Sequence, residues 1–258
     1  MLSDFSKISV GGVLTSCLGR EKLALLLGDY IEKDRRNAKK EPVLVFSLNG
    51  HSISEANSDP SYMSIMNKAD IVHADGQSVV FFSKWLKGRD IEERTATTDM
   101  IHDLPDFVQK KLKHYLFGGK AEVVREASKI MMEKYTNFDV VGFKNGYFSE
   151  EDELSICNDI NESGCDVLWV GLGKPKEQEF CLRNKERLNV SVIITCGGCY
   201  NFITGDYSRA PKWAQNIGVE WFHRVLTNPR KLLYRYLTTN PHAIYCVIKN
   251  EISVRKYS

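Results

Sequence analysis

The sequence predicts an α/β fold, in which a mostly parallel, Rossmann-like sheet carries helices on both faces and is followed by a helical C-terminal appendage. Short apolar runs alternate with amphipathic segments along most of the 258 residues. Continuous apolar strands of this kind are typical of parallel sheets that are covered on both faces. Glycine or polar residues follow several of these runs, where the strands should end. The length allows one large domain and an appendage.

The elements of the first half follow from periodicity and from helix-start signals. Apolar residues recur at helical spacing over residues 23–31, and the apolar run 43–47 predicts a short buried strand. The pair Asp59-Pro60 predicts a helix start, because proline is favoured at the first helical position. We expect a further strand at 70–74 and a helix at 77–86.

The second half repeats this alternation of strands and helices. Strands are expected at 114–117, 138–142, 166–170 and 190–195. Helices are expected at 121–135, from 149 onward and at 175–188.

Beyond residue 205 the pattern changes to short helices, three of which open at proline. They are expected at 211–216, 219–227, 229–239 and 241–251. We therefore predict a core domain at residues 1–205 and an appendage at 206–258.

Charge is distributed unevenly along the chain. Residues 207–258 contain nine Lys or Arg and two acidic residues, a net charge of +7 against −5 for the rest. This segment is also rich in aromatic residues. A basic segment on a mildly acidic body indicates an anionic partner, such as a lipid phosphate, a diphosphate or a nucleic acid.

Composition excludes several classes of protein. No apolar run approaches the roughly 18 residues that a membrane-spanning helix needs, and no signal peptide precedes the body, so we expect a cytoplasmic protein. The seven cysteines are scattered and suit reduced thiols. Cys196 and Cys199 have CxxC spacing but no second ligand pair, so we expect no metal site and no cofactor.

Glycines follow three expected strands of the second half. They are Gly118-Gly119, Gly171-Leu-Gly173 and Gly197-Gly198. Glycine lets backbone N–H groups approach a diphosphate, and ligands of parallel sheets bind at the carboxyl ends of strands. A nucleotide site is therefore expected there. A P-loop and a complete GxGxxG are both absent, which counts against ATPase and dinucleotide functions.

Asp75 is the carboxylate that best suits catalysis. It follows an apolar strand, precedes Gly76, and would lie near Ser47 and Asn49 if their two strands are neighbours. Direct displacement at a sugar needs one general base to take the proton of the attacking hydroxyl. The alternative is that Asp75 only caps a turn or a helix.

These residues, in their order and spacing, resemble the WecG/TagA/CpsF glycosyltransferases. The resemblance covers residues 43–237. It is carried by Asp75-Gly76, the segment 93–99, the run from Gly171 to Glu179, the segment 197–205, Arg209-Ala-Pro211, Glu220-Trp221 and Arg224. It implies an inverting, metal-independent transfer of a hexose, N-acetylhexosamine or uronic acid derivative. The implied donor is a UDP-sugar and the implied acceptor an undecaprenyl-diphosphate-linked saccharide, in surface polysaccharide synthesis of the bacterial cell envelope.

The resemblance also implies roles for individual residues. Asp75 matches the base, Ser47 and Asn49 match polar neighbours, and Arg94 matches an arginine for the leaving diphosphate, unless it only pairs with Glu92 or Glu93. The implied donor-binding residues are Gly118, Gly119, Tyr147, Gly171, Gly173, Lys174, Gln178, Glu179, Gly198 and Asn201. Tyr147 would stack on uracil, although as a bare sequence feature it could equally be core. Glu179 could instead cap its helix.

Two positions depart from the family pattern. Thr97 stands where members usually have Gly, and Asn201 stands where they usually have Asp. Asn201 would still bond a ribose hydroxyl, but without charge, so uridine contacts or donor choice would differ.

The appendage is expected to close the site and to recognise the lipid diphosphate at the inner face of the membrane, as a peripheral protein. Its Arg224, Arg230 and Arg235 suit diphosphate oxygens, and its aromatic rings suit the membrane interface. The alternative is a solvated basic helix pair packed on the body.

Two other classes of function remain as alternatives. One is a nucleic-acid-binding module that uses the basic segment, although we expect no nucleic acid partner. The other is a nucleotide-dependent oxidoreductase, which lacks its glycine fingerprint. The sequence leaves the donor sugar, the acceptor saccharide and the pathway open, and a homo-oligomer stays compatible with it.

Overall fold

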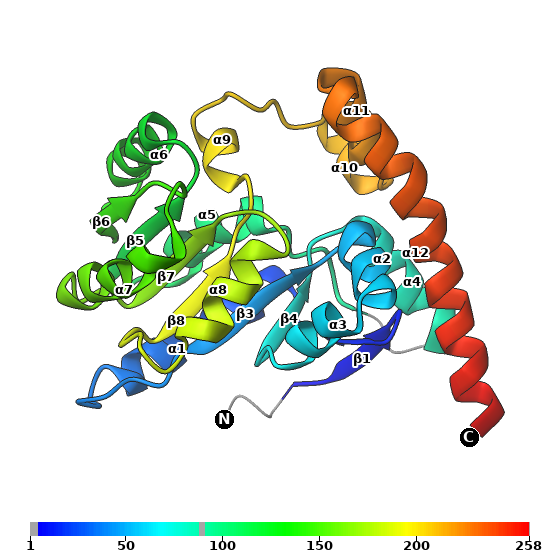
Figure 1. Cartoon of the computed structure of the whole chain (residues 1–258), viewed down its shortest axis with the longest axis horizontal. Coiled ribbons are helices and arrows are strands. Elements are labelled where there is room, and N and C mark those ends of the chain that lie inside the picture. The colour runs from blue at the N-terminus through cyan, green and yellow to red at the C-terminus, as the bar shows by residue number, and fades with distance from the viewer. Residues whose placement is uncertain (1–4, 88–90, 258) are drawn as a thin grey trace. The chain divides into compact units, whose positions relative to one another are not determined.

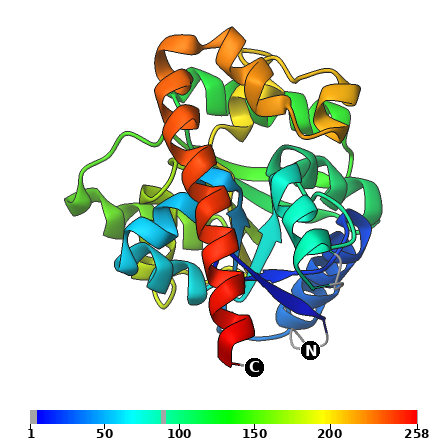
Figure 2. The same cartoon turned by 90° about the vertical axis from the view of Figure 1, so that its right-hand side faces the viewer.

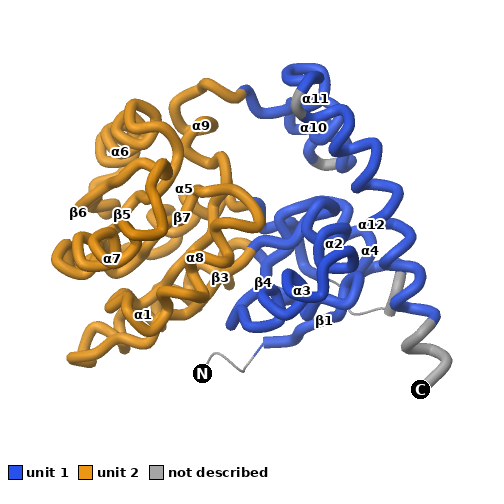
Figure 3. The backbone as a smooth tube through the Cα atoms, viewed as in Figure 1, with its two compact units in different colours: residues 1–19, 47–96, 208–258 blue, residues 20–46, 97–207 orange. Residues whose placement is uncertain are grey.

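The computed structural model describes residues 5–87 and 91–257, and the chain divides into two compact units (Figure 3). Unit 1 comprises residues 1–19, 47–96 and 208–258, and unit 2 comprises residues 20–46 and 97–207. The C-terminal segment therefore clusters with two segments from the first 96 residues.

The main sheet has six strands in the order β4-β3-β8-β7-β5-β6. The strands are β3 (Val43–Leu48), β4 (Ile71–Ala74), β5 (Leu112–Gly118), β6 (Phe138–Lys144), β7 (Val167–Gly171) and β8 (Val192–Thr195). The pairs β3/β8, β8/β7, β7/β5 and β5/β6 are parallel. Every residue of β3, β7 and β8 is buried, as expected for strands covered on both faces. The predicted α/β class is confirmed.

Unit 2 carries seven helices in the part of the chain that is described. They are α1 (Arg20–Asp34), α5 (Thr97–Phe107), α6 (Ala121–Lys134), the 3₁₀ turn η1 (Glu150–Asp152), α7 (Glu153–Glu162), α8 (Lys176–Asn184) and α9 (Cys199–Ile203). In Figure 1, α6 lies against β5 and β6. The sequence predicted each of them except α5 and α9. Helix α5 contains Pro105, which weakens a helical pattern.

Unit 1 contains an antiparallel hairpin and the remaining helices. The hairpin strands β1 (Lys7–Val10) and β2 (Val13–Ser16) were not predicted. The helices are α2 (Gly50–Ser58), α3 (Pro60–Asn67), α4 (Gln77–Lys87), α10 (Lys212–Asn216), α11 (Glu220–Thr227) and α12 (Pro229–Tyr257). Asp59 caps α3 with Pro60 at its first turn, as predicted.

The prediction of two helices at 229–239 and 241–251 is wrong, because α12 is a single helix that continues through Pro241 (Figure 2). Helix α12 packs along α2, with Ala243 and Val247 fully buried. Polar contacts add to this packing: Ser54 bonds Nδ1 of His242 at 2.8 Å, and Asn250 donates to Asn57 at 3.1 Å. Tertiary packing therefore outweighs the weak helix propensity of proline.

No helix of residues 5–87 and 91–257 combines the length and the apolar character needed to cross a bilayer.

A buried histidine in β5 predicts a pH-dependent stability. The ring of His114 stacks on Phe138 at 3.6 Å between centroids, and its Nδ1 accepts from Nε1 of Trp169 at 3.1 Å. Burial lowers the pKa of His114 from 6.5 to about 3. Below pH 6.5, His114 binds a proton in the unfolded chain, whereas in the folded chain it stays neutral down to about pH 3. The free energy of unfolding should therefore fall by up to about 1.4 kcal/mol per pH unit between pH 6.5 and 3 from this group alone.

Urea unfolding of the wild type and of His114→Gln at several pH values between 7.5 and 5 tests this prediction. Gln keeps an acceptor for Trp169 but does not titrate. The variant should therefore take up about one proton fewer on unfolding, so its free energy of unfolding should depend less steeply on pH. Equal slopes in the two proteins would contradict it.

Candidate active site

Asp75 and Asn49 lie together in unit 1, where β3 and β4 end. Nδ2 of Asn49 donates to Oδ2 of Asp75 at 3.1 Å. The backbone N–H groups of Asp75 and Gly76 both donate to the carbonyl oxygen of Leu48, at 2.9 and 3.2 Å. Asp75 is half-buried, and Ser47 is buried one residue before Leu48. Asn49 and Asp75 are therefore neighbours, as their positions at two strand ends predicted.

The start of α2 determines how the Asn49 amide is oriented. Asn49 is the N-cap, and its Oδ1 accepts from the backbone N–H of Ser52 and from the Ser52 hydroxyl, both at 3.1 Å. Since Oδ1 is used in the cap, Nδ2 is the group that faces Asp75. Helix α2, which the sequence analysis missed, thus positions a donor on the candidate base.

A single carboxylate joins two arginines of unit 1. Oε2 of Glu220 accepts from Nη1 of Arg94 at 2.8 Å, and Oε1 accepts from Nη2 of Arg224 at 3.0 Å. Gln215 extends the cluster, with Oε1 accepting from Arg209 at 3.0 Å. The ion pair of Arg94 therefore includes Glu220, which the sequence analysis did not consider, because 126 residues separate them.

Arg224 also interacts electrostatically with the candidate base. Burial alone would lower the pKa of Arg224, but the charges of Glu220, Tyr236 and Asp75 raise it above its usual value. Arg224 is therefore a cation whose charge interacts with that of Asp75. Of the other predicted arginines, Arg235 lies over the Tyr236 ring at 5.0 Å, and Arg230 is exposed at the start of α12.

The glycine turns of unit 2 contact one another at the carboxyl ends of their strands. The N–H of Gly119 donates to Gly171 O at 3.1 Å, and the N–H of Gly146 donates to Gly119 O at 2.9 Å. A Cβ on Gly118 would overlap the carbonyl of Gly171, and one on Gly171 would lie 2.8 Å from Gly197 O. Only glycine permits such close backbone approach. The loops after β5, β6, β7 and β8 thus form one continuous cradle.

The side chains predicted to bind the donor have different environments in unit 2. Tyr147 is 74% exposed, so the alternative that it belongs to the core is wrong. Nδ2 of Asn201 donates to Asp206 at 3.4 Å. Gln178 is fully buried, whereas Glu179 is half-buried. Burial raises the pKa of Glu177, and the charge of Lys174 opposes that rise.

Glu177 is the functional candidate that the sequence analysis missed. Its side chain is 1% exposed, and Oε2 accepts from the N–H groups of Gly173 and Gly197, each at 3.0 Å. The available signal was its position, four residues after Gly173 and on the inner face of α8.

The CxxC pair after β8 consists of two buried thiols. Burial raises the pKa of the Cys196 thiol well above its usual value, and Sγ of Cys199 contacts the carbonyl of Thr97 at 3.9 Å. Residues 5–87 and 91–257 contain no group of three His, Cys, Asp or Glu side chains arranged to hold a metal ion.

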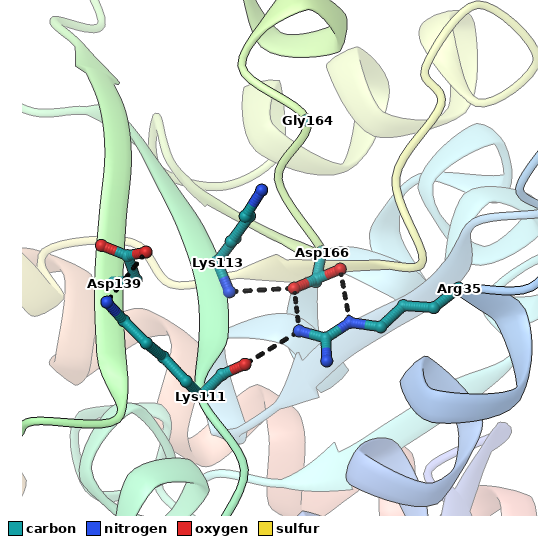
Figure 4. Close-up of a pocket in the computed structure, with 6 residues that line it drawn as sticks. All are labelled: Arg35, Lys111, Lys113, Asp139, Gly164 and Asp166. Atoms are coloured by element: carbon teal, nitrogen blue, oxygen red, sulfur yellow. Dashed lines mark hydrogen bonds and ion pairs between the residues drawn. The ribbon is translucent and has the colours of Figure 1, made fainter.

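A pocket at the opposite, amino ends of the unit 2 strands is occupied by ion pairs (Figure 4). Asp166 accepts from Nε of Arg35 at 3.1 Å and from the N–H of Lys113 at 2.9 Å, and Lys111 pairs with Asp139 at 3.2 Å. Burial would raise the pKa of Asp166, but these hydrogen bonds and charges hold it below its usual value. The lining carries three basic and two acidic side chains, and both carboxylates are paired within the unit.

Comparison with known proteins shows the family of the chain. The sequence model of the glycosyl transferase WecG/TagA/CpsF family matches residues 8–257. The chain is similar to the N-acetylglucosaminyldiphosphoundecaprenol N-acetyl-beta-D-mannosaminyltransferase of Bacillus subtilis (strain 168). The two are 26% identical over 224 residues, which cover 86% of this chain and 85% of that protein. The protein of the same name from Bacillus spizizenii (strain ATCC 23059 / NRRL B-14472 / W23) is 28% identical over 198 residues, covering 76% of this chain and 75% of that one.

The family match spans nearly the whole chain, and the fold is the parallel α/β sheet that the sequence predicted. The polar strand ends and glycine turns that carried the resemblance lie within the matched residues. The chain therefore belongs to the WecG/TagA/CpsF family of glycosyl transferases.

Proposed function

We propose that the protein transfers a hexose, or an N-acetylhexosamine or uronic acid derivative, from a UDP-sugar to an undecaprenyl-diphosphate-linked saccharide, with inversion and without a metal ion. The observation that carries this proposal is the pair of Asp75 and Asn49, in which the Asn49 amide donates to the carboxylate and so orients it. The charge of Arg224 also interacts with Asp75. Both relatives are named as mannosaminyltransferases that act on N-acetylglucosaminyldiphosphoundecaprenol, which supports the acceptor class.

In this mechanism Asp75 acts as the general base. An acceptor hydroxyl oxygen attacks the anomeric carbon, its proton passes to the Asp75 carboxylate, and the bond from that carbon to the diphosphate oxygen breaks, which releases UDP. One displacement of this kind inverts the anomeric configuration. The hydrogen bond from Asn49 helps to orient the carboxylate that takes the proton.

Arginine side chains take the role that a metal ion has in other transferases. Negative charge develops on the diphosphate as the bond to the sugar breaks, and fixed cations stabilise it. Arg94 and Arg224 are held by one carboxylate, Glu220, which keeps two guanidinium groups together before substrate binds. This preorganisation supports the metal-independent proposal.

The proposed donor site is the glycine cradle of unit 2. Tyr147 presents an exposed ring that suits stacking on uracil, and it directly follows Gly146 in the cradle. Asn201 and its neighbour Asp206 offer an amide and a carboxylate for ribose hydroxyls. Gly198 precedes the start of α9, and Gly119 and Gly173 have positive φ angles, which glycine adopts without strain.

We further propose a peripheral position at the inner face of the cytoplasmic membrane. Large apolar side chains are exposed on the C-terminal helices of unit 1, among them Trp213, Phe222 and Tyr234. The same segment is basic, and aromatic and basic side chains together suit a lipid interface with anionic headgroups. A lipid-linked acceptor would be presented at that interface.

A donor screen tests the proposed function. The full chain is incubated with a short-chain lipid-diphosphate N-acetylglucosamine and each of several UDP-sugars, with and without a metal chelator, and products are identified by mass spectrometry and NMR. We expect transfer from at least one UDP-sugar, an inverted anomeric centre, and unchanged rates with the chelator. Retention of configuration, or loss of activity with the chelator, would contradict the proposal.

A further inference from the structure

The turns after β7 and β8 share one side-chain acceptor. Gly173 and Gly197 both have positive φ angles, +79° and +51°. Their two N–H groups converge on the same oxygen, Oε2 of Glu177, at 3.0 Å each. Oε1 of Glu177 accepts from Nε2 of Gln178 at 3.3 Å. One buried carboxylate thus bonds both turns.

This arrangement differs from ordinary helix capping. Glu177 lies in the first turn of α8, and a carboxylate there commonly bonds N–H groups at the start of its own helix. The bond to Gly173 fits that description. The bond to Gly197 does not, because Gly197 follows a different strand, twenty residues along the chain. Glu177 therefore links two neighbouring strand ends.

The linked turns face open space on one side. Apart from each glycine and its two chain neighbours, no described residue has an atom within 4 Å of the position that a Cβ would take on Gly173 or Gly197. The other side of the cradle is closed, since a Cβ on Gly171 would meet Gly197 O, Tyr200 and Cys196. A diphosphate could therefore approach the turns from the open side while Glu177 bonds them from within.

We propose that Glu177 is a positioning residue, which fixes the turns at Gly173 and Gly197 in one relative arrangement so that they form the diphosphate side of the donor site. This inference rests on the proposed donor site in unit 2. Glu177 acts through the two turns and does not itself touch the donor.

The state of the carboxyl group is consistent with this role. Burial raises the pKa of Glu177, while Lys174 and the N–H groups of Gly197 and Gly173 act in the opposite direction. A neutral acceptor in the same place should serve equally well, because the turns need an oxygen atom and not a charge. A glutamine would also avoid repelling a diphosphate.

The neighbouring Gln178 makes glutamine a suitable substitute at position 177. Gln178 is fully buried, and within the described residues its Oε1 has no hydrogen-bond partner. In Glu177→Gln the new amide oxygen would accept from both glycines. Its amide NH₂ would then donate to Oε1 of Gln178 after that side chain turns over.

The test compares Glu177→Gln with Glu177→Met and Glu177→Ala in the full chain. Met fills the same space without an acceptor, so it keeps the protein folded if Ala does not. UDP affinity is measured by calorimetry and the amide exchange of Gly173 and Gly197 by NMR. We expect Met and Ala to weaken UDP binding about tenfold or more and to speed exchange at both glycines. Gln should stay within about threefold of the wild type.

Glu153→Ala provides the matched control. Glu153 is also a buried glutamate of unit 2, and it accepts from Arg183 at 2.6 Å and Asn184 at 2.9 Å, away from the glycine turns. Its loss should lower the melting temperature but leave UDP affinity unchanged. If the role of Glu177 were purely structural, its substitutions would likewise lower the melting temperature without changing UDP affinity.

The outcomes separate the two proposals. If the wild type binds UDP and Glu177→Met binds it equally well, the role of Glu177 is overturned and the donor site stands. Unchanged exchange at Gly173 and Gly197 would also overturn it. A wild-type chain that does not bind UDP would overturn the proposed donor site itself.

Discussion

Replacing Asp75 by Asn is expected to lower kcat by about 10²–10⁴-fold, the range that general base catalysis contributes. Asn has nearly the same shape as Asp, and its amide oxygen can still accept the hydrogen bond from Nδ2 of Asn49. The strand ends stay joined through the backbone of Leu48. The variant therefore loses the capacity to take a proton while the geometry of the cluster is kept.

Initial rates of sugar transfer, with UDP binding measured in parallel, test this prediction. UDP affinity should change by less than about threefold, because the proposed donor residues all lie in unit 2. Asp59→Asn is the control, since Asp59 is an exposed helix cap of the same unit that bonds Ser61 and should leave kcat unaltered. Turnover of Asp75→Asn at the wild-type rate would rule out Asp75 as the base.

The parts of the site that could be predicted are those determined by residues close in sequence. A polar residue directly after an apolar strand marks a strand end, and parallel strands bring such ends to one edge of the sheet. This reasoning placed Asn49 and Asp75 together, and the structure confirms it. The glycine turns followed from the same local signal, and the residues from Gly118 to Gly197 do form one cradle.

The parts that could not be predicted depend on contacts between distant residues. No local pattern shows that Glu220 joins Arg94 and Arg224, because the partner residues come from separate segments. Glu177 gives a similar case, since its second glycine partner follows another strand. The continuity of α12 through Pro241 depends on packing against α2. Local sequence signals do not describe such tertiary contacts.

The grouping of segments into units also affects how the C-terminal residues are interpreted. The sequence suggested a core at 1–205 and an appendage that closes over it. In the structure, residues 208–258 form a unit with residues 1–19 and 47–96, and Glu220, Arg224 and Asp75 belong to that unit. The arginines therefore belong to the same folded unit as the base. We expect their substitution to affect chemistry more than donor binding.

Replacing Arg224 by Ala should lower kcat about 10²–10³-fold, a loss typical of removing one group that stabilises developing charge. Arg224 is held by Glu220 and lies in the electrostatic field of Asp75, so its loss removes a fixed cation from the catalytic cluster. It also leaves Glu220 with one arginine in place of two. Glu220→Gln keeps the shape of the side chain and one acceptor oxygen, so it should lower kcat less than Arg224→Ala does.

Steady-state kinetics with the lipid-linked acceptor distinguish this role from a general effect of charge. Lys249→Ala removes one positive charge from α12, where Lys249 lies 5.9 Å from the centroid of the Tyr245 ring, and should leave kcat within about twofold. Arg224→Lys should recover only part of the activity, because a lysine cannot bond Glu220 through a planar guanidinium fork. If Arg224→Ala instead raised KM for the acceptor with kcat unchanged, Arg224 would contribute to ground-state binding alone.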